Sequence, residues 1–169
     1  GSAHLSSGDS ALAIKYLTKA VAIREIECSG TDALGDSYNS LGVAYNKQGY
    51  YSPAISNLTK AASIRERTHP GSTYLAFTYN QLGRAHMGSG DSALAIPYLT
   101  KAVAIQEREC PGSDDLSNSY NNLGRAYNKQ GDYTSAISSF TKAASIREHF
   151  CPAICQKIWI IYSESVCRK

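Results

Sequence analysis

The feature of this sequence that most constrains its fold is a repeat of 41 residues. The dipeptide Leu-Gly begins at Leu41, Leu82 and Leu123, and glycines recur at the same interval at positions 8, 49, 90 and 131. A period of about 20 to 50 residues is typical of solenoids, in which each unit packs only against its neighbours. The repeat therefore predicts an elongated array of similar units that share one continuous core.

Within each repeat, two stretches have the apolar spacing of amphipathic α-helices. In the unit at residues 32–67, the apolar positions of the first stretch are Leu34, Tyr38, Leu41, Ala44 and Tyr45, and those of the second are Ala54, Ile55, Leu58, Ala61, Ala62 and Ile64. Gly49 separates them, and a glycine directly after a helix is typical of a left-handed turn. Because the connection is short, we expect an antiparallel pair, helix A and helix B, in each unit. Small residues recur at Gly42, Ala54 and Ala61, which predicts that the two helices approach closely.

The repeat pattern covers residues 1–150 and divides them into four units. The expected boundaries are a partial unit at 1–29 and complete units at 30–70, 71–111 and 112–150. Residues 1–8 align with residues 83–90, so the first unit resembles the end of a truncated repeat. Residues 151–169 leave the pattern, and we expect a C-terminal capping helix or an irregular tail there. The alternative is an exposed apolar end that pairs with another chain.

The order of residues in a unit resembles the tetratricopeptide repeat. The motifs that carry the resemblance are Leu-Gly-x-x-Tyr at Leu41, Gly-x-Tyr at Gly49, Ala-Ile at Ala54, Lys-Ala at Lys60 and Ile-Arg-Glu at Ile64. The long 41-residue period, with Tyr-Asn-x-Leu-Gly and Thr-His-Pro-Gly at 68–71, is similar to the kinesin light chain subclass. The resemblance implies an all-α fold, a right-handed superhelical α-solenoid of antiparallel helix pairs with the A helices on its concave face.

An asparagine recurs on the face of helix A that the core stripe leaves free. Asn39, Asn80 and Asn121 occupy the same position in successive units. Asparagine is a mediocre helix former, so its recurrence indicates a role for the side chain. The amide can both donate and accept hydrogen bonds, and the resemblance implies that it clamps the backbone of an extended peptide. The alternatives are that these amides bridge adjacent A helices, or that they only copy an ancestral unit.

The same face continues one turn further with Val43, Arg84 and Arg125, and beyond them with Asn46, Met87 and Asn128. We expect Arg84 and Arg125 to lie about 10 Å apart, one inter-helix spacing, which suits two acidic side chains or one terminal carboxylate of a ligand. The alternative is solvated surface charge. Together with the three asparagines, these six residues form the candidate peptide-binding site.

Composition and charge favour a protein of the cytoplasm. The net charge is only +3 and no basic run is present, so nothing indicates a nucleic-acid partner. We expect no membrane association and no secretion, because the sequence has neither a long apolar stretch nor a signal peptide. Five cysteines, an odd number, favour reduced thiols.

Recurrent lysines and glutamates on helix B are expected to form a solvated outer surface: Lys19, Lys60, Lys101 and Lys142 with Glu25, Glu66, Glu107 and Glu148.

No pattern in the sequence indicates catalysis, a cofactor or a metal. The four histidines, His4, His69, His86 and His149, have no recurring acidic or nucleophilic companions, and no glycine-rich phosphate loop is present. His149, Cys151 and Cys155 are three candidate zinc ligands without a second pair, which is a weak signal. We therefore predict a protein that is not an enzyme.

The function that these observations favour is a non-enzymatic scaffold for protein–protein interaction. It would bind an extended, partly acidic peptide in the groove of the A helices. The alternative is a structural module that stacks head-to-tail into a homo-oligomer through exposed repeat ends. A third, weaker possibility is that the chain is a recognition segment of a larger enzyme or motor-associated protein.

Overall fold

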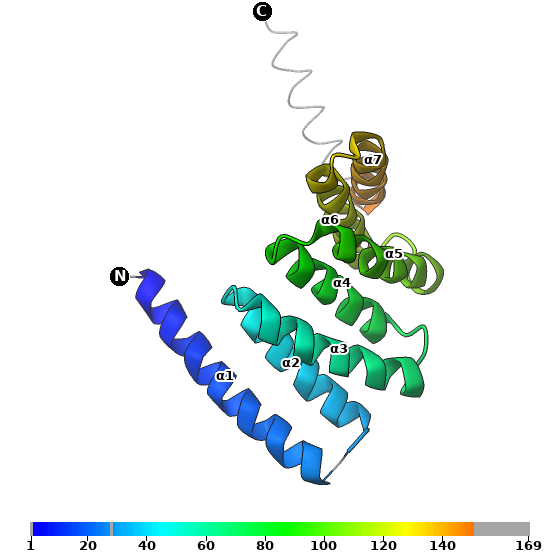
Figure 1. The fold of residues 1–169 in the computed structure, drawn as a ribbon. Helices are drawn as coiled ribbons and strands as arrows, with labels where there is room; N and C mark the ends of the chain where they lie inside the picture. The colour runs from blue at the N-terminus through cyan, green and yellow to red at the C-terminus, as the bar shows by residue number, and fades with distance from the viewer. Residues whose placement is uncertain (1, 28, 151–169) are drawn as a thin grey trace, which may run out of the picture.

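The helices of this protein follow one another in a curved array (Figure 1). The computed structural model describes residues 2–27 and 29–150. The helices in this part of the chain are α1 (Ser2–Glu27), α2 (Asp32–Lys47), α3 (Tyr51–Thr68), α4 (Thr73–Gly88), α5 (Ser92–Glu109), α6 (Asp114–Gln130) and α7 (Tyr133–Phe150). Each helix packs against the next one in the chain. The pairs α2/α3, α4/α5 and α6/α7 are the expected antiparallel A and B helices, which confirms the all-α repeat fold.

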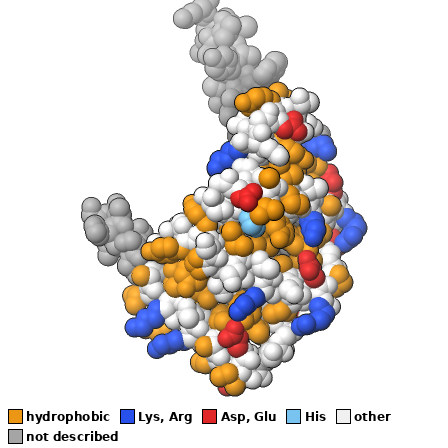
Figure 2. Space-filling model, in the orientation of Figure 1, with side chains coloured by type: hydrophobic (Ala, Val, Ile, Leu, Met, Phe, Trp, Pro, Cys, Tyr) orange, Lys and Arg blue, Asp and Glu red, His pale blue; other side chains and the backbone are white. Residues whose placement is uncertain are grey.

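The A helices form the inner layer of the curve. Helix α2 contacts α4, and α4 contacts α6, whereas among the described residues α3 does not contact α5 and α5 does not contact α7. In a bent stack, the helices that approach each other more closely lie on the concave side. The space-filling view shows the hollow on this side of the array (Figure 2). Side chains on the free face of α2, α4 and α6 therefore line the hollow.

Local sequence signals set the ends of the helices. Ser72, Asp91 and Ser113 each accept a hydrogen bond from the backbone N–H three residues later, at 3.2, 3.0 and 3.1 Å, and so cap α4, α5 and α6. Gly49 follows α2 with φ of 78°, the left-handed conformation that glycine adopts without strain. The turn after the first helix of the unit is therefore the one that the sequence predicts.

The structure differs from the expectation at Gly8, which is equivalent to the turn glycines at 49, 90 and 131. Helix α1 runs from Ser2 to Glu27 without a break. A glycine lowers helix propensity, but it does not by itself end a helix. Continuing the existing helix through a glycine costs only about 1 kcal/mol.

The core contains the residues that the apolar spacing predicts. In α2 and α3 the buried apolar side chains are those of Leu34, Tyr38, Leu41, Ala54, Leu58, Ala61, Ala62 and Ile64, and Ala44, Tyr45 and Ile55 are half-buried. One cluster joins three consecutive helices through Ala62, Leu75 and Ala102. A Cβ atom on Gly42 would lie 2.6 Å from Cγ of Leu58, and one on Gly83 would overlap Leu99 in the same way. The close approach of helices A and B is thus confirmed.

The lysines and glutamates of the B helices do more than face solvent, which corrects the expectation for them. Tyr38, Tyr79 and Tyr120 each donate a hydroxyl hydrogen bond to a glutamate of the preceding B helix, Glu25, Glu66 and Glu107. Lys60 and Lys142 donate to the hydroxyls of Tyr38 and Tyr120 at 3.4 and 3.3 Å. Burial, and then the hydrogen bond to the carboxylate, raise the pKa of all three tyrosines. These contacts link each unit to the next, and period counting within one unit does not reveal them.

His86 replaces the tyrosine found at the equivalent positions 45 and 127, and it gives a test of the core. Its ring is buried and stacks on Tyr98 with centroids 5.5 Å apart. Burial lowers the pKa of His86, although Asp91 opposes the shift. Below the ordinary histidine pKa of about 6.5, the unfolded chain therefore binds more protons than the folded chain. The stability that the buried neutral His86 contributes is fully present above that pH, and it is lost as the pH decreases through it.

We expect His86→Tyr to reduce the loss of stability between about pH 7 and pH 5, because the group that must be protonated is removed. Urea denaturation at several pH values gives the free energy of unfolding of the wild type and of the variant. The effect is the difference between the two slopes of this free energy against pH, because the contributions of the carboxylates are the same in both proteins and cancel. Identical slopes for the two proteins would contradict the burial of a neutral imidazole.

Part of the chain is outside this description. The described residues do not include Cys28 or residues 151–169, where we expect a cap or a tail. The zinc candidates Cys151 and Cys155 belong to that last segment. Cys110 is a free, half-buried thiol. None of the described helices has the length and apolarity needed to span a bilayer.

Candidate functional site

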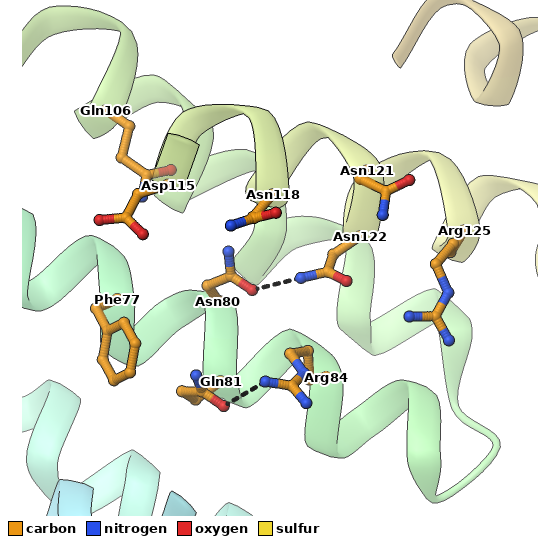
Figure 3. Close-up of a pocket in the computed structure, with 10 residues that line it drawn as sticks. All are labelled: Phe77, Asn80, Gln81, Arg84, Gln106, Asp115, Asn118, Asn121, Asn122 and Arg125. Atoms are coloured by element: carbon orange, nitrogen blue, oxygen red, sulfur yellow. Dashed lines mark hydrogen bonds between the residues drawn. The ribbon is translucent and has the colours of Figure 1, made fainter. Parts of the chain in front are cut away.

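A pocket of about 360 Å³ opens between α4 and α6 on the concave side (Figure 3). One stripe of α4 and one stripe of α6 face each other across it, and α5 contributes a single side chain. The lining residues are Phe77, Asn80, Gln81 and Arg84 of α4, Gln106 of α5, and Asp115, Asn118, Asn121, Asn122 and Arg125 of α6. Four of the nine predicted site residues, Asn80, Arg84, Asn121 and Arg125, are thus brought to one pocket.

The pocket has two chemically different ends. Asp115, Phe77 and Gln106 lie at one side, and Arg84 and Arg125 lie at the other, with the asparagine amides between them (Figure 3). A second hollow adjoins the acidic end, because Phe77 and Asp115 line both. It extends to Asp36, Asn39 and Ser40 of α2. The two hollows together form a polar groove across the three A helices.

Two of the three recurrent asparagines bridge adjacent A helices. Asn80 is 8% exposed, donates to Ser119 of α6 and accepts from Asn122 at 2.8 Å. Asn39 accepts a 3.2 Å hydrogen bond from Thr78 of α4. Asn121 has no hydrogen-bond partner among the described residues, and it is half-buried at the pocket wall. The amide of Asn121 is thus the one of the three that is available to a ligand.

The remaining predicted residues lie away from these two hollows. Met87 is 5% exposed and packs in the core with Leu99 and Leu123, so its expected role at the groove surface is corrected. The last turn of α4 faces the neighbouring helices rather than the groove. Asn46 donates to the carbonyl oxygen of Gln81 at 3.3 Å, Val43 packs against the core, and Asn128 is exposed.

The two arginines are exposed side chains from successive A helices. Arg84 donates to Oε1 of Gln81 at 3.3 Å, and Arg125 has no hydrogen bond or ion pair with any described residue. A guanidinium can hold a carboxylate with two parallel hydrogen bonds, which adds geometric specificity to charge attraction. This end of the pocket can therefore bind an acidic group.

The opposite end departs from the rest of the array. At the equivalent position of the other B helices stand Arg24, Arg65 and Arg147, and in α5 the arginine is replaced by Gln106. Gln106 is 4% exposed, and its Oε1 is the buried side-chain atom without a hydrogen-bond partner in the described part of the protein. Leaving such an acceptor unsatisfied costs about 1–3 kcal/mol.

Sequence reasoning missed the residues Phe77, Gln81, Gln106, Asp115, Asn118 and Asn122 of the pocket. Two signals could have found some of them. Phe77 and Gln81 lie three residues before and one residue after Asn80, on the same helical face. Gln106 is recognisable as the exception in a row of arginines.

The described residues contain no group of three histidine, cysteine, aspartate or glutamate side chains placed to hold a metal ion. The polar groups of the pocket are amides, two guanidiniums and one carboxylate, which suit hydrogen bonding to a polar ligand.

Comparison of structures shows the same fold in kinesin light chain-like proteins and in a MamA protein. BtubC (BKLC) from P. vanneervenii superimposes with a TM-score of 0.78 at 24% identity, covering 85% of this chain and 58% of that protein. A proposed kinesin light chain of Podospora anserina with nearly identical TPR-like repeats gives 0.75 at 23% identity, covering 89% and 73%. A MamA structure gives 0.62 at 18% identity, covering 87% and 72%. The present chain thus spans little more than half the length of BtubC.

Comparison of sequences leads to a family. A search among curated proteins finds no significant match. Family profiles described as tetratricopeptide repeat match residues 1–26, 34–70 and 74–149, and no enzyme family is detected. Repeats of this kind are generally protein–protein interaction modules and typically lack catalytic activity. The matches cover the helical units described above, and the chain belongs to the tetratricopeptide repeat family.

Proposed function

We propose that this protein is a scaffold that binds an extended, acidic segment of a partner protein along α2, α4 and α6. The acidic side chains of the segment contact Arg84 and Arg125, and the amide of Asn121 contacts its backbone. A cytoplasmic location, favoured by the cysteine content, belongs to the same proposal. Asn80 supports the site by holding α4 and α6 together rather than by contacting the ligand.

The observation that carries this proposal is the pair of arginines at one end of the pocket. They come from equivalent positions of two consecutive A helices, and both are exposed. Among the described residues neither forms an ion pair. Cations that are not neutralised by a carboxylate of the fold remain available to an acidic ligand.

The test is a fluorescence anisotropy titration with labelled peptides of about ten residues that carry two adjacent acidic residues. We expect saturable binding that weakens as salt increases, because screening is already strong at about 0.1 M, where the Debye length is about 10 Å. Peptides with asparagine and glutamine in place of the acidic pair are the matched control. Equal binding of both peptides, or binding that is insensitive to salt, would refute the role of the arginines.

Self-assembly is the second candidate function, and one observation supports it. Among the described residues α1 packs only against α2, and it exposes Leu12, Tyr16, Ile23 and Ile26 by 52, 65, 54 and 86%. An apolar helix face of this kind suits contact with another repeat. Light scattering of the same samples over a wide dilution range decides this alternative, since a monomer at every concentration excludes it.

A further inference from the structure

The end of the pocket at Gln106 can be compared with the equivalent place one repeat earlier, the junction where α3 packs between α2 and α4. Arg65 of α3 is 5% exposed and lies between the A helices α2 and α4. Its guanidinium pairs with Asp36 at 2.5 Å, donates to the carbonyl oxygen of Tyr74 at 3.1 Å and to Thr78, and lies 5.9 Å from the centre of the Tyr74 ring. This buried cation is thus held by a carboxylate from one helix and an aromatic ring from the next.

At the following junction the same three positions carry Phe77, Gln106 and Asp115. Phe77 stands where Asp36 stood, and Asp115 stands where Tyr74 stood, so the carboxylate and the aromatic ring have exchanged helices. The cation between them is missing, because Gln106 is shorter than arginine and uncharged. A carboxylate and an aromatic face thus remain at a place where the preceding repeat holds a guanidinium.

Two further observations indicate that this place accepts a donor. Oε1 of Gln106 is buried at the pocket wall without a partner among the described residues. The carboxylate of Asp115 is exposed and forms no hydrogen bond or ion pair there. Phe77, 41% exposed, offers a ring for a cation to lie against. All three groups favour a positively charged donor.

We infer that the end of the pocket formed by Phe77, Gln106 and Asp115 binds an arginine side chain of the partner segment. The guanidinium takes the place that Arg65 occupies one repeat earlier, donating to Oε1 of Gln106 and to Asp115. The inference rests on the proposed function and adds to it. The preferred segment carries an acidic group at one position and an arginine at another, in register with the two ends of the pocket.

The experiment compares arginine with citrulline, which has nearly the same shape but no charge. The probes are the acidic peptides described above, each with one arginine or one citrulline placed at increasing distance from the acidic pair. A matched pair without the acidic residues is included. At one distance we expect the arginine peptide to bind about tenfold more tightly than the citrulline peptide, as one charge-assisted contact allows.

Two variants test the assignment to these residues. Gln106→Arg places a tethered guanidinium in the site, as in three other repeats, and Asp115→Asn removes the charge. Both are expected to abolish the preference for arginine, so that in each variant the arginine and citrulline peptides bind within about twofold of each other, because no free carboxylate then faces an empty site. Gln106→Arg is also expected to raise the melting temperature, since it removes the unsatisfied Oε1 of Gln106 and its guanidinium can pair with the carboxylate of Asp115.

The outcomes separate this inference from the proposed function. Binding of acidic peptides with no preference for arginine at any distance overturns the arginine site and leaves the acidic groove. A preference for arginine that persists in both variants also overturns it. A preference seen only in peptides without the acidic pair supports the arginine site and refutes the acidic groove. If no peptide binds, both are wrong.

Discussion

Replacement of Leu99 by alanine is expected to lower the free energy of unfolding by about 2–5 kcal/mol. Leu99 lies in α5, its side chain is completely buried, and it packs directly over Gly83 of α4. Removing the isobutyl group leaves a cavity that the facing residue cannot fill, since glycine has no side chain. Denaturation by urea, followed by circular dichroism, measures the loss.

Leu94 provides the matched control for this prediction. It lies on the same helix, is 50% exposed, and its replacement by alanine is expected to change stability by no more than about 0.5 kcal/mol. Gly83→Ala alone is expected to destabilise the protein because its Cβ overlaps Leu99, but the same change in the Leu99→Ala background should recover stability. Additive effects of the two substitutions would contradict direct packing of Leu99 on Gly83.

The fold could be predicted because each unit repeats the same apolar positions. Leu58 and Leu99 are buried in consecutive units, and each packs directly on the glycine of the facing helix A, Gly42 or Gly83. The observed fold differs from the predicted one where a residue does not adopt the same secondary structure as its equivalents in the other repeats. Gly8 lies inside α1, although the glycines at 49, 90 and 131 lie in the turns that follow helices, since a glycine lowers helix propensity without ending a helix by itself.

The candidate site could be predicted only in part, because period counting fixes the face of a helix and not the partners of each side chain. Asn80 lies on the predicted face, yet its amide is used by Ser119 and Asn122 of the next A helix. Met87 follows Arg84 by three residues, but that turn of α4 is buried by neighbouring helices. Such contacts join residues about one repeat apart, and no single repeat contains them.

Charge reversal of both arginines, Arg84→Glu with Arg125→Glu, is expected to weaken the binding of the acidic peptides by at least about a hundredfold. Each charge-assisted hydrogen bond contributes about 1.5–3 kcal/mol, and the new carboxylates add repulsion. The fold should be unaffected, because both side chains are exposed and neither forms an ion pair among the described residues. Anisotropy titration measures the binding, and circular dichroism checks the helix content.

The control must change the net charge equally, since the long-range field of the protein also steers an anionic peptide. Lys15→Glu with Lys19→Glu meets this condition on α1, where both side chains are exposed and far along the array from α4 and α6. We expect this control to slow association slightly and to leave the affinity within about threefold at moderate salt, because screening removes distant charges first. Equal losses in the two double variants would assign the binding to net charge alone, whereas a loss confined to Arg84 and Arg125 assigns it to the groove.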